Sequence, residues 1–128
     1  KDFQQLAVIR QMVADLAFPI QIVGGDIVRE DDGLAMSSRN QYLDAQQRPA
    51  STLIHRVLLG MREGYITGLS RERIEADATA ALQAGGFAVD YAALRTPDLL
   101  EPPHEGGPRV ALIAARLGST RLIDNLEF

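Results

Sequence analysis

The chain has 128 residues, no cysteine and a formal net charge of −4 at pH 7. This length allows one domain with a core of its own, and the lack of cysteine excludes a disulfide framework, a thiolate metal site and a cysteine nucleophile. A net negative charge disfavours general nucleic-acid binding, so affinity for an anion has to come from local cations such as Lys1, Arg29 and Arg39. No apolar run approaches the length of a membrane span. We expect a cytoplasmic protein that binds neither nucleic acid nor membrane.

An amphipathic helix is predicted over residues 2–17, where apolar side chains recur at helical spacing: Phe3, Leu6, Ile9, Val13 and Leu16. The β-branched run at residues 20–23 is predicted to form a strand, after Pro19 has ended the helix. The chain opens on Lys1 and enters the helical pattern at once. We therefore expect a piece of a longer protein, whose other part covers the apolar face of this helix.

The first turn of that helix carries polar side chains suited to an anion. A helix N-terminus presents free N–H groups and the positive end of a dipole, which favour phosphate. Lys1 and Gln5 are four residues apart and share one face of the helix, with Asp2 beside them. The alternative interpretation is a frayed, solvated first turn, which the spacing by itself favours.

A change of domain is predicted at Gly24-Gly25-Asp26, because paired glycines beside an aspartate are typical of a linker. We expect residues 1–25 and residues 26–128 to form separate units. Residues 27–29 are predicted to form a short strand that leads out of the linker.

The most unusual stretch follows at residues 29–40. It contains the turn dipeptide Asp32-Gly33, a short apolar run, and then two serines, an arginine and an asparagine in succession. Small hydroxyls beside the planar guanidinium of Arg39 suit phosphate oxygens, and a loop of this kind can close over a triphosphate. On residue types alone, a plain polar turn in which Ser37 and Ser38 cap the following residues is an equally good interpretation.

Two more helices are predicted in the middle of the chain. A helical stripe of apolar residues covers residues 49–63. Asp44 is positioned as an N-cap for residues 45–47, which precede it. Residues 64–68 are predicted to form a loop. Ser70 then caps a third helix, which stops at Gly85-Gly86.

Three strands are predicted in the last third, at residues 87–92, 110–115 and 121–125, the second being the apolar central one. These elements favour an α+β fold, with a three-stranded antiparallel sheet and helices packed on one face. His55 has no second histidine, cysteine or carboxylate cluster at metal spacing, and we interpret it as structural or solvent-facing. His104 is interpreted as a residue of a long Pro- and Gly-rich connection. No metal site is expected.

The string Met36-Ser37-Ser38-Arg39, which we call the signature loop, resembles the Met-Ser-Lys-Ser loop of class I aminoacyl-tRNA synthetases and related nucleotidylyl transferases. The longer string from Val28 to Asn40 resembles the pantothenate synthetase (pantoate–β-alanine ligase) family. The opening string Lys1–Gln5 and the closing string Arg121–Asn125 resemble the same family. The likeness runs over the whole chain but covers only the second half, roughly, of what that family normally has.

This resemblance implies a ligase of the route to coenzyme A, which condenses pantoate with β-alanine through a pantoyl adenylate and releases AMP, with ATP as substrate and Mg²⁺ on its phosphates. The residues that match the family's ATP contacts are Lys1, Asp2, Val28 (by its backbone), Met36, Ser37, Ser38 and Arg39, and Gln5 matches the pantoate contact. It also implies that residues 26–128 form a lid domain. The last helix and strand of a Rossmann-like nucleotide-binding domain would precede it.

Turnover by this chain alone is not expected. The family's His-x-Gly-His-type motif belongs to the N-terminal domain, and neither His55 nor His104 matches it, so no catalytic residue is assigned here. The resemblance implies a partner in that missing domain and an intact homodimer. Two alternatives stay open: a non-catalytic nucleotide-binding or assembly module, and a different adenylate-forming or nucleotidylyl-transferring enzyme. A pure scaffold, however, has no need of the signature loop.

Overall fold

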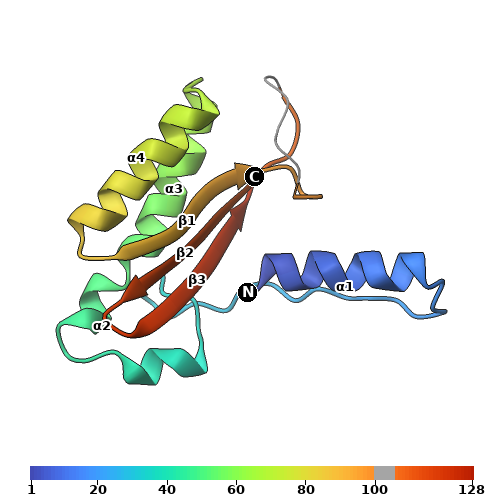
Figure 1. Cartoon of the computed structure of the whole chain (residues 1–128), viewed down its shortest axis with the longest axis horizontal. Helices are drawn as coiled ribbons and strands as arrows, with labels where there is room; N and C mark the ends of the chain where they lie inside the picture. Colours follow the sequence, from blue (N-terminus) through green and yellow to red (C-terminus); the bar gives the residue numbers. More distant parts are fainter. Residues whose placement is uncertain (100–105) are drawn as a thin grey trace.

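The computed structural model describes residues 1–99 and 106–128. It shows an α+β body and a single helix that projects from it (Figure 1). The elements in chain order are α1 (Phe3–Asp15), the 3₁₀ helix η1 (Ser38–Tyr42), α2 (Gln47–Ala50), α3 (Leu53–Ile66), α4 (Arg71–Ala84), β1 (Ala88–Arg95), β2 (Val110–Leu117) and β3 (Thr120–Glu127). His104 lies outside the described residues.

The body is a three-stranded antiparallel sheet in the order β1-β2-β3, with α3 and α4 on one face (Figure 1). Every residue of β2 except Arg116 is buried, and β2 has a strand on each side. Its residues Ala111, Ile113, Ala115 and Leu117 belong to the core that also contains residues of α3 and α4. The predicted α+β class and the central position of this strand are confirmed. The main core forms between the helices and the sheet, and its fully buried side chains include Leu58, Leu82 and Leu94.

The local signals around α4 are also confirmed. The Ser70 side chain accepts a hydrogen bond from the Arg73 backbone N–H at 3.2 Å, as an N-cap does. The helix ends at Ala84, and Gly86 takes a left-handed conformation with φ +90° beyond it. Both signals act within a few residues of the helix end, which is why the sequence alone predicts them.

The helix predicted at residues 49–63 is in fact two helices, α2 and α3. The hydroxyls of Ser51 and Thr52 donate back to the carbonyls of Arg48 and Pro49, which interrupts the regular ladder at that point. The loop predicted at 64–68 is wrong at its start, because α3 continues to Ile66. Gly64 is buried within this helix, and a Cβ there would lie 3.1 Å from Cγ1 of Ile74. A small residue at this position lets α3 approach α4.

The strand predicted at residues 20–23 is absent from the described residues. This segment is extended but has no neighbouring strand to complete a ladder, and it runs back alongside α1 (Figure 1). Residues 27–29 form no full strand either, since only Arg29 makes an isolated bridge, with Ala35. A β-branched run gives the propensity for a strand, but pairing needs a partner strand.

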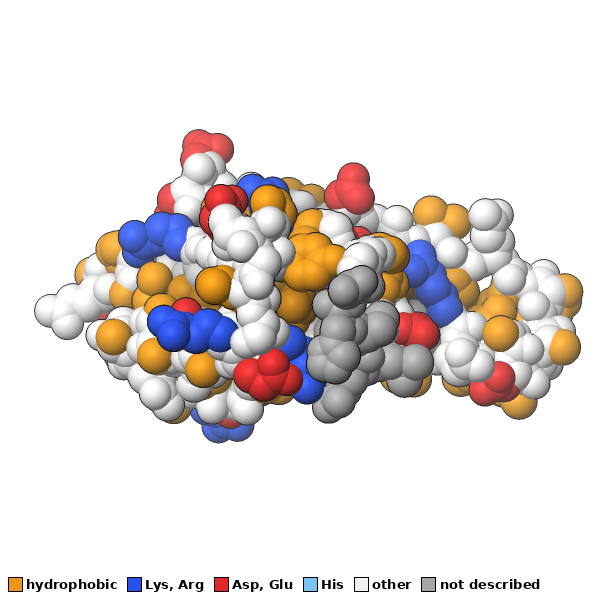
Figure 2. All heavy atoms as spheres, turned by 90° about the horizontal axis from the view of Figure 1, so that it is seen from above, with side chains coloured by type: hydrophobic (Ala, Val, Ile, Leu, Met, Phe, Trp, Pro, Cys, Tyr) orange, Lys and Arg blue, Asp and Glu red, His pale blue; other side chains and the backbone are white. Residues whose placement is uncertain are grey.

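Helix α1 is one turn shorter than predicted and buries none of its residues. Its large apolar side chains Val8 and Met12 are exposed, as are Leu16, Phe18 and Ile20 in the segment after it. In Figure 2, apolar side chains reach the surface at the end of the molecule that α1 forms. None of the helices among residues 1–99 and 106–128 is long and apolar enough to cross a membrane.

A tight turn joins β2 to β3, and Gly118 holds a left-handed conformation in it, with φ +61°. We expect Gly118→Ala to lower the free energy of unfolding by about 1–2 kcal/mol, because a Cβ disfavours this conformation. The new Cβ would also press on the side-chain amide of Gln47. Urea denaturation followed by circular dichroism measures the change.

The matched control for this turn is Gly60→Ala in α3. Gly60 is helical and a Cβ there would meet no atom within 4 Å, so this variant is expected to gain about 0.5–1 kcal/mol. A Gly118→Ala variant as stable as the parent chain would show that the turn accepts a side chain.

Candidate anion-binding site

The segment before the signature loop folds back on itself as a small hairpin. The backbone N–H of Glu30 donates to the carbonyl of Leu34 at 2.8 Å, and that of Gly33 donates to the carbonyl of Glu30 at 2.9 Å. Gly33 has φ +95°, which confirms the predicted turn. Leu34 and Ala35 are buried, so the arm leading to the signature loop is fixed to the body.

The signature loop leaves that hairpin and enters η1. The Ser37 hydroxyl accepts a hydrogen bond from the Arg39 backbone N–H at 3.2 Å, so Ser37 caps η1, as in the plain-turn interpretation. Ser38 and Arg39 are exposed, and neither side chain has a hydrogen-bond partner in the described part of the chain. The loop therefore keeps one hydroxyl and one guanidinium available to a ligand.

The other residues matched to ATP in this region are Val28, on the arm before the loop, and Met36, the first residue of the loop. The carbonyl of Val28 accepts a hydrogen bond from the backbone N–H of Met36 at 2.9 Å. Both side chains are exposed, Val28 to 64 % and Met36 to 47 %. The structure therefore places exposed apolar side chains at the start of the signature loop and on the arm that leads to it.

The first turn of α1 lies against the end of β3. The Asp2 carboxylate accepts a hydrogen bond from the Gln5 backbone N–H at 3.0 Å, and it is the N-cap of α1. The Lys1 ammonium donates to the carbonyl of Ile123 at 3.4 Å, and the Asn125 side chain donates to the carbonyl of Lys1 at 2.7 Å. This turn is held by specific contacts, unlike the frayed first turn of the alternative interpretation.

Lys1 and Arg39 influence each other although they are far apart in sequence. Burial lowers the pKa of the Lys1 ammonium; the negative charge of Asp124 opposes this shift, and the positive charge of Arg39 adds to it. Two cations near each other repel, and a bound polyanion relieves that repulsion. A phosphate or similar anion bound next to both cations would therefore be stabilised by their charge.

A hollow of about 750 Å³ opens beside this turn, between α1, the linker residues and the end of β3. Lys1, Asp2 and Gln5 line it, together with Arg29 and Asn125. The signature loop does not line this hollow. The predicted site residues therefore fall into two groups, one around the hollow and one on the loop, and both groups lie against β3, through Lys1 and through η1.

The residues that link the two groups were not assigned a role from the sequence. Arg29 and Asp124 form an ion pair with an N···O distance of 2.6 Å, and the Asp124 side chain is only 3 % exposed. The sequence offered one signal for this pair: Asp124 is a charged residue inside the strand predicted at residues 121–125. A carboxylate buried in a strand requires a partner.

His55 has a structural position under the hairpin. A Cβ on Gly33 would lie 2.6 Å from its Cδ2 atom, so the imidazole ring occupies the space that only glycine leaves free. Burial and the charge of Arg29 both lower the pKa of His55, which favours the neutral ring. Among residues 1–99 and 106–128, no group of three or more His, Cys, Asp or Glu side chains could hold a metal ion.

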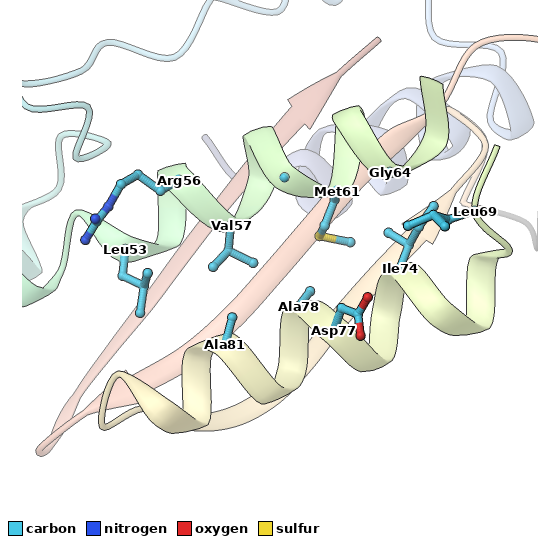
Figure 3. A pocket seen from close by; sticks show the side chains of 11 residues that line it. Leu53, Arg56, Val57, Met61, Gly64, Leu69, Ile74, Asp77, Ala78 and Ala81 are labelled. Carbon is cyan, nitrogen blue, oxygen red and sulfur yellow. The ribbon is translucent and has the colours of Figure 1, made fainter. Parts of the chain in front are cut away.

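A second hollow, of about 290 Å³, lies between α3 and α4 (Figure 3). Val57 and Met61 from α3 point toward Ala78 and Ala81 from α4 across it. Its lining is mainly apolar and contains none of the residues predicted to bind ATP or pantoate. It does not suit a phosphate group, so we place the candidate site at the signature loop and α1.

An exposed arginine with no hydrogen-bond partner among the described residues lies beside an exposed hydroxyl on the signature loop, and a lysine lies at the N-terminus of α1; both are cationic groups of the kind that bind anions. The chain belongs to the pantoate-beta-alanine ligase family, whose model matches residues 1–127. This agrees with the resemblance noted in the sequence.

Relatives with high sequence identity carry the name pantothenate synthetase. The chain is 79% identical over 128 residues to the one from Stenotrophomonas maltophilia strain K279a, which covers all of this chain and 46% of that relative. It is 68% identical over 133 aligned positions to the one from Xanthomonas campestris pv. campestris strain B100, again over all of this chain and 47% of that relative. The chain thus spans about half the length of the curated relatives that it matches.

Solved structures support the fold. The pantothenate synthetase of Thermus thermophilus superposes with a TM-score of 0.88 at 43% identity, over 98% of this chain and 46% of that one. The pantoate-beta-alanine ligase of Francisella tularensis superposes with a TM-score of 0.67 over 98% of this chain and 40% of that one. At 23% identity the second likeness concerns the fold alone.

Proposed function

We propose that this chain supplies the phosphate-gripping half of an ATP-dependent ligase that joins pantoate to β-alanine through a pantoyl adenylate. The observation that carries the proposal is that Lys1 at the start of α1 and η1, which carries the exposed Arg39, both lie against β3. Family membership supplies the reaction class. Attack of the pantoate carboxylate on the α-phosphorus of ATP builds negative charge, and preorganised cations lower the barrier to it.

Each site residue has a proposed role that fits its surroundings. Ser38 and Arg39 donate to the phosphates when the lid closes, and Ser37 holds the loop by capping η1. Lys1 donates from the other side. Gln5, which lines the hollow, holds pantoate there.

The remaining ATP contacts are proposed on the same basis. The exposed surface of Val28 and Met36 next to the loop is placed to contact the adenine ring. Asp2 orients the first turn of α1 toward the nucleotide by capping it.

Mg²⁺ is proposed to arrive with ATP as part of the substrate. The described residues offer no carboxylate cage for it. Mg²⁺ commonly keeps several waters and is bound through substrate phosphates, so no protein cage is required of this chain.

The exposed apolar side chains of α1 support a division of the chain into two units. Residues 1–25 would belong to a nucleotide-binding domain that covers the apolar side chains of α1, and residues 26–128 would form the lid. That domain would supply the catalytic histidine motif and the contacts of a homodimer. Since ATP is an intracellular substrate, we propose a cytoplasmic location.

Titration calorimetry with ATP and Mg²⁺ tests the role of the signature loop. We expect the chain to bind ATP weakly and Arg39→Ala to weaken binding at least about tenfold, because a charge-assisted hydrogen bond contributes about 1.5–3 kcal/mol. Arg39→Lys keeps the charge but loses the planar fork, so its affinity should lie between the two.

Arg56→Ala is the matched control. Arg56 is an exposed arginine on α3 that lines the other hollow, so removing it changes the net charge equally and should leave affinity unchanged. Failure of the parent chain to bind ATP would contradict the proposed role and favour a non-catalytic assembly module. Steady formation of pantothenate by the chain alone would contradict the assignment of half a site.

A further inference from the structure

Three consecutive residues of β3 contact both halves of the candidate site. The carbonyl of Ile123 accepts from the Lys1 ammonium, and the side chain of Asn125 donates to the Lys1 carbonyl. Between them, the Asp124 carboxylate faces the hairpin that carries the signature loop and binds Arg29. No role in the proposed reaction has been given to any of these three residues so far.

The hairpin is held to β3 through the guanidinium of Arg29. It donates to both carboxylate oxygens of Asp124, at 2.6 and 3.0 Å, and to the carbonyl of Asn125 at 3.2 Å. A fourth hydrogen bond, at 3.0 Å, goes to the carbonyl of Gly33 in the hairpin turn. Arg29 therefore connects the base of the signature loop to the last strand by a two-oxygen pair with Asp124 and one backbone contact with Asn125, while its bond to Gly33 fixes it within the hairpin.

The helix side is held by Asn125. Its side chain is buried and donates to the Lys1 carbonyl at 2.7 Å, while its backbone N–H donates to the Asp124 carboxylate at 2.8 Å. Asn125 thus contacts the start of α1 by its side chain and the guanidinium of Arg29 by its carbonyl. Its backbone N–H also binds Asp124, the partner of Arg29. A central strand next to it, β2, keeps this part of β3 rigid.

We propose that Asn125 is a positioning residue for the reaction: with Asp124 and Arg29 it sets the separation between Lys1 and Arg39 before a nucleotide arrives. The inference rests on the proposed function, because it names what holds the two cations of that site. Binding groups held in place by a second layer of contacts lose less entropy when the ligand binds. Asn125 itself is not proposed to contact a phosphate.

A ligand-free measurement tests the positioning directly. The chain has no cysteine, so a nitroxide can be attached to Tyr42→Cys, an exposed position at the end of η1. We expect it to broaden the amide signals of the first turn of α1 in NMR spectra of the parent chain. Asn125→Ala should reduce that broadening, because the turn is released from β3. Unchanged broadening in Asn125→Ala would overturn the proposal.

The same variants are then titrated with ATP and Mg²⁺. Asn125→Ala should weaken binding by about fivefold, as expected for the loss of one hydrogen bond of about 1 kcal/mol, and should have no further effect in a Lys1→Ala background. A fivefold loss that persists without Lys1 would mean a general structural role and would overturn the proposal. An unchanged affinity in Asn125→Ala would overturn it as well.

Thr120→Ala is the matched control, since Thr120 is a buried polar residue at the opposite end of β3. It should leave both the broadening and the affinity as in the parent chain. If the parent chain binds no ATP, the proposed function fails, while the broadening still decides whether Asn125 holds α1 in place.

Discussion

Arg29→Met is expected to lower the free energy of unfolding by about 3–5 kcal/mol, the largest single effect that we expect in this chain. The Asp124 side chain is 3 % exposed and receives two of its hydrogen bonds from this guanidinium. Methionine fills a similar volume, but it leaves a buried carboxylate without its cation, with only the backbone N–H of Asn125 as a donor, and it removes the bonds to two backbone carbonyls. Urea denaturation at pH 7 gives the free energy.

The double variant Arg29→Met/Asp124→Leu separates the burial of a charge from the loss of packing. Removing both charges should recover a large part of the stability, because no unpaired carboxylate is left inside. Arg73→Met is the control: Arg73 pairs with Asp77 on the exposed surface of α4, and its loss should change stability by less than about 1 kcal/mol. Equal effects of Arg29→Met and Arg73→Met would show that burial adds nothing to the first pair.

Leu82→Ala is expected to cost about 3 kcal/mol, within the range found for fully buried leucines. Leu82 is 0% exposed in α4 and belongs to the main core between the helices and the sheet. The substitution removes apolar contacts and leaves a cavity that the rigid sheet cannot close. The midpoint of urea denaturation should fall while its slope stays constant, as for a loss of stability alone.

Ile66→Ala is the control for the core. Ile66 is the last residue of α3, and its side chain is 66% exposed. Its loss should therefore change the free energy of unfolding by less than about 0.5 kcal/mol. A Leu82→Ala variant within that same range would mean that the contact between α4 and the sheet contributes little to stability.

The α+β body and helix α1 differ in how they are stabilised. The body has its own core, and each of its three strands is paired. Helix α1 buries none of its residues, and its contacts with the body include those of Asn125 with Lys1 and of Tyr91 with Gln4. The placement of Lys1 therefore depends strongly on the contacts of Asn125.

Local signals made most of the fold predictable from the sequence. The Ser70 cap, the Asp32-Gly33 turn and the apolar run at residues 110–115 each depend on neighbours within a few positions. The strand predicted at 20–23 failed for the opposite reason, because a strand exists only with a partner. The break between α2 and α3 was missed because the hydroxyls of Ser51 and Thr52 can point outward or bond back to the helix.

By itself the sequence determined the family and the signature loop, and it supplied the residues that we propose to bind an anion, since residue types and their order carry these properties. Only the tertiary structure decided how they meet. Arg29 and Asp124 are 95 positions apart, and Asn125 and the carbonyl of Lys1 are 124 apart. No periodicity or local motif encodes such a pairing, because it depends on how the sheet and helices close long stretches of chain on one another. That closure places β3 against both the start of α1, which holds Lys1, and η1, which holds Arg39.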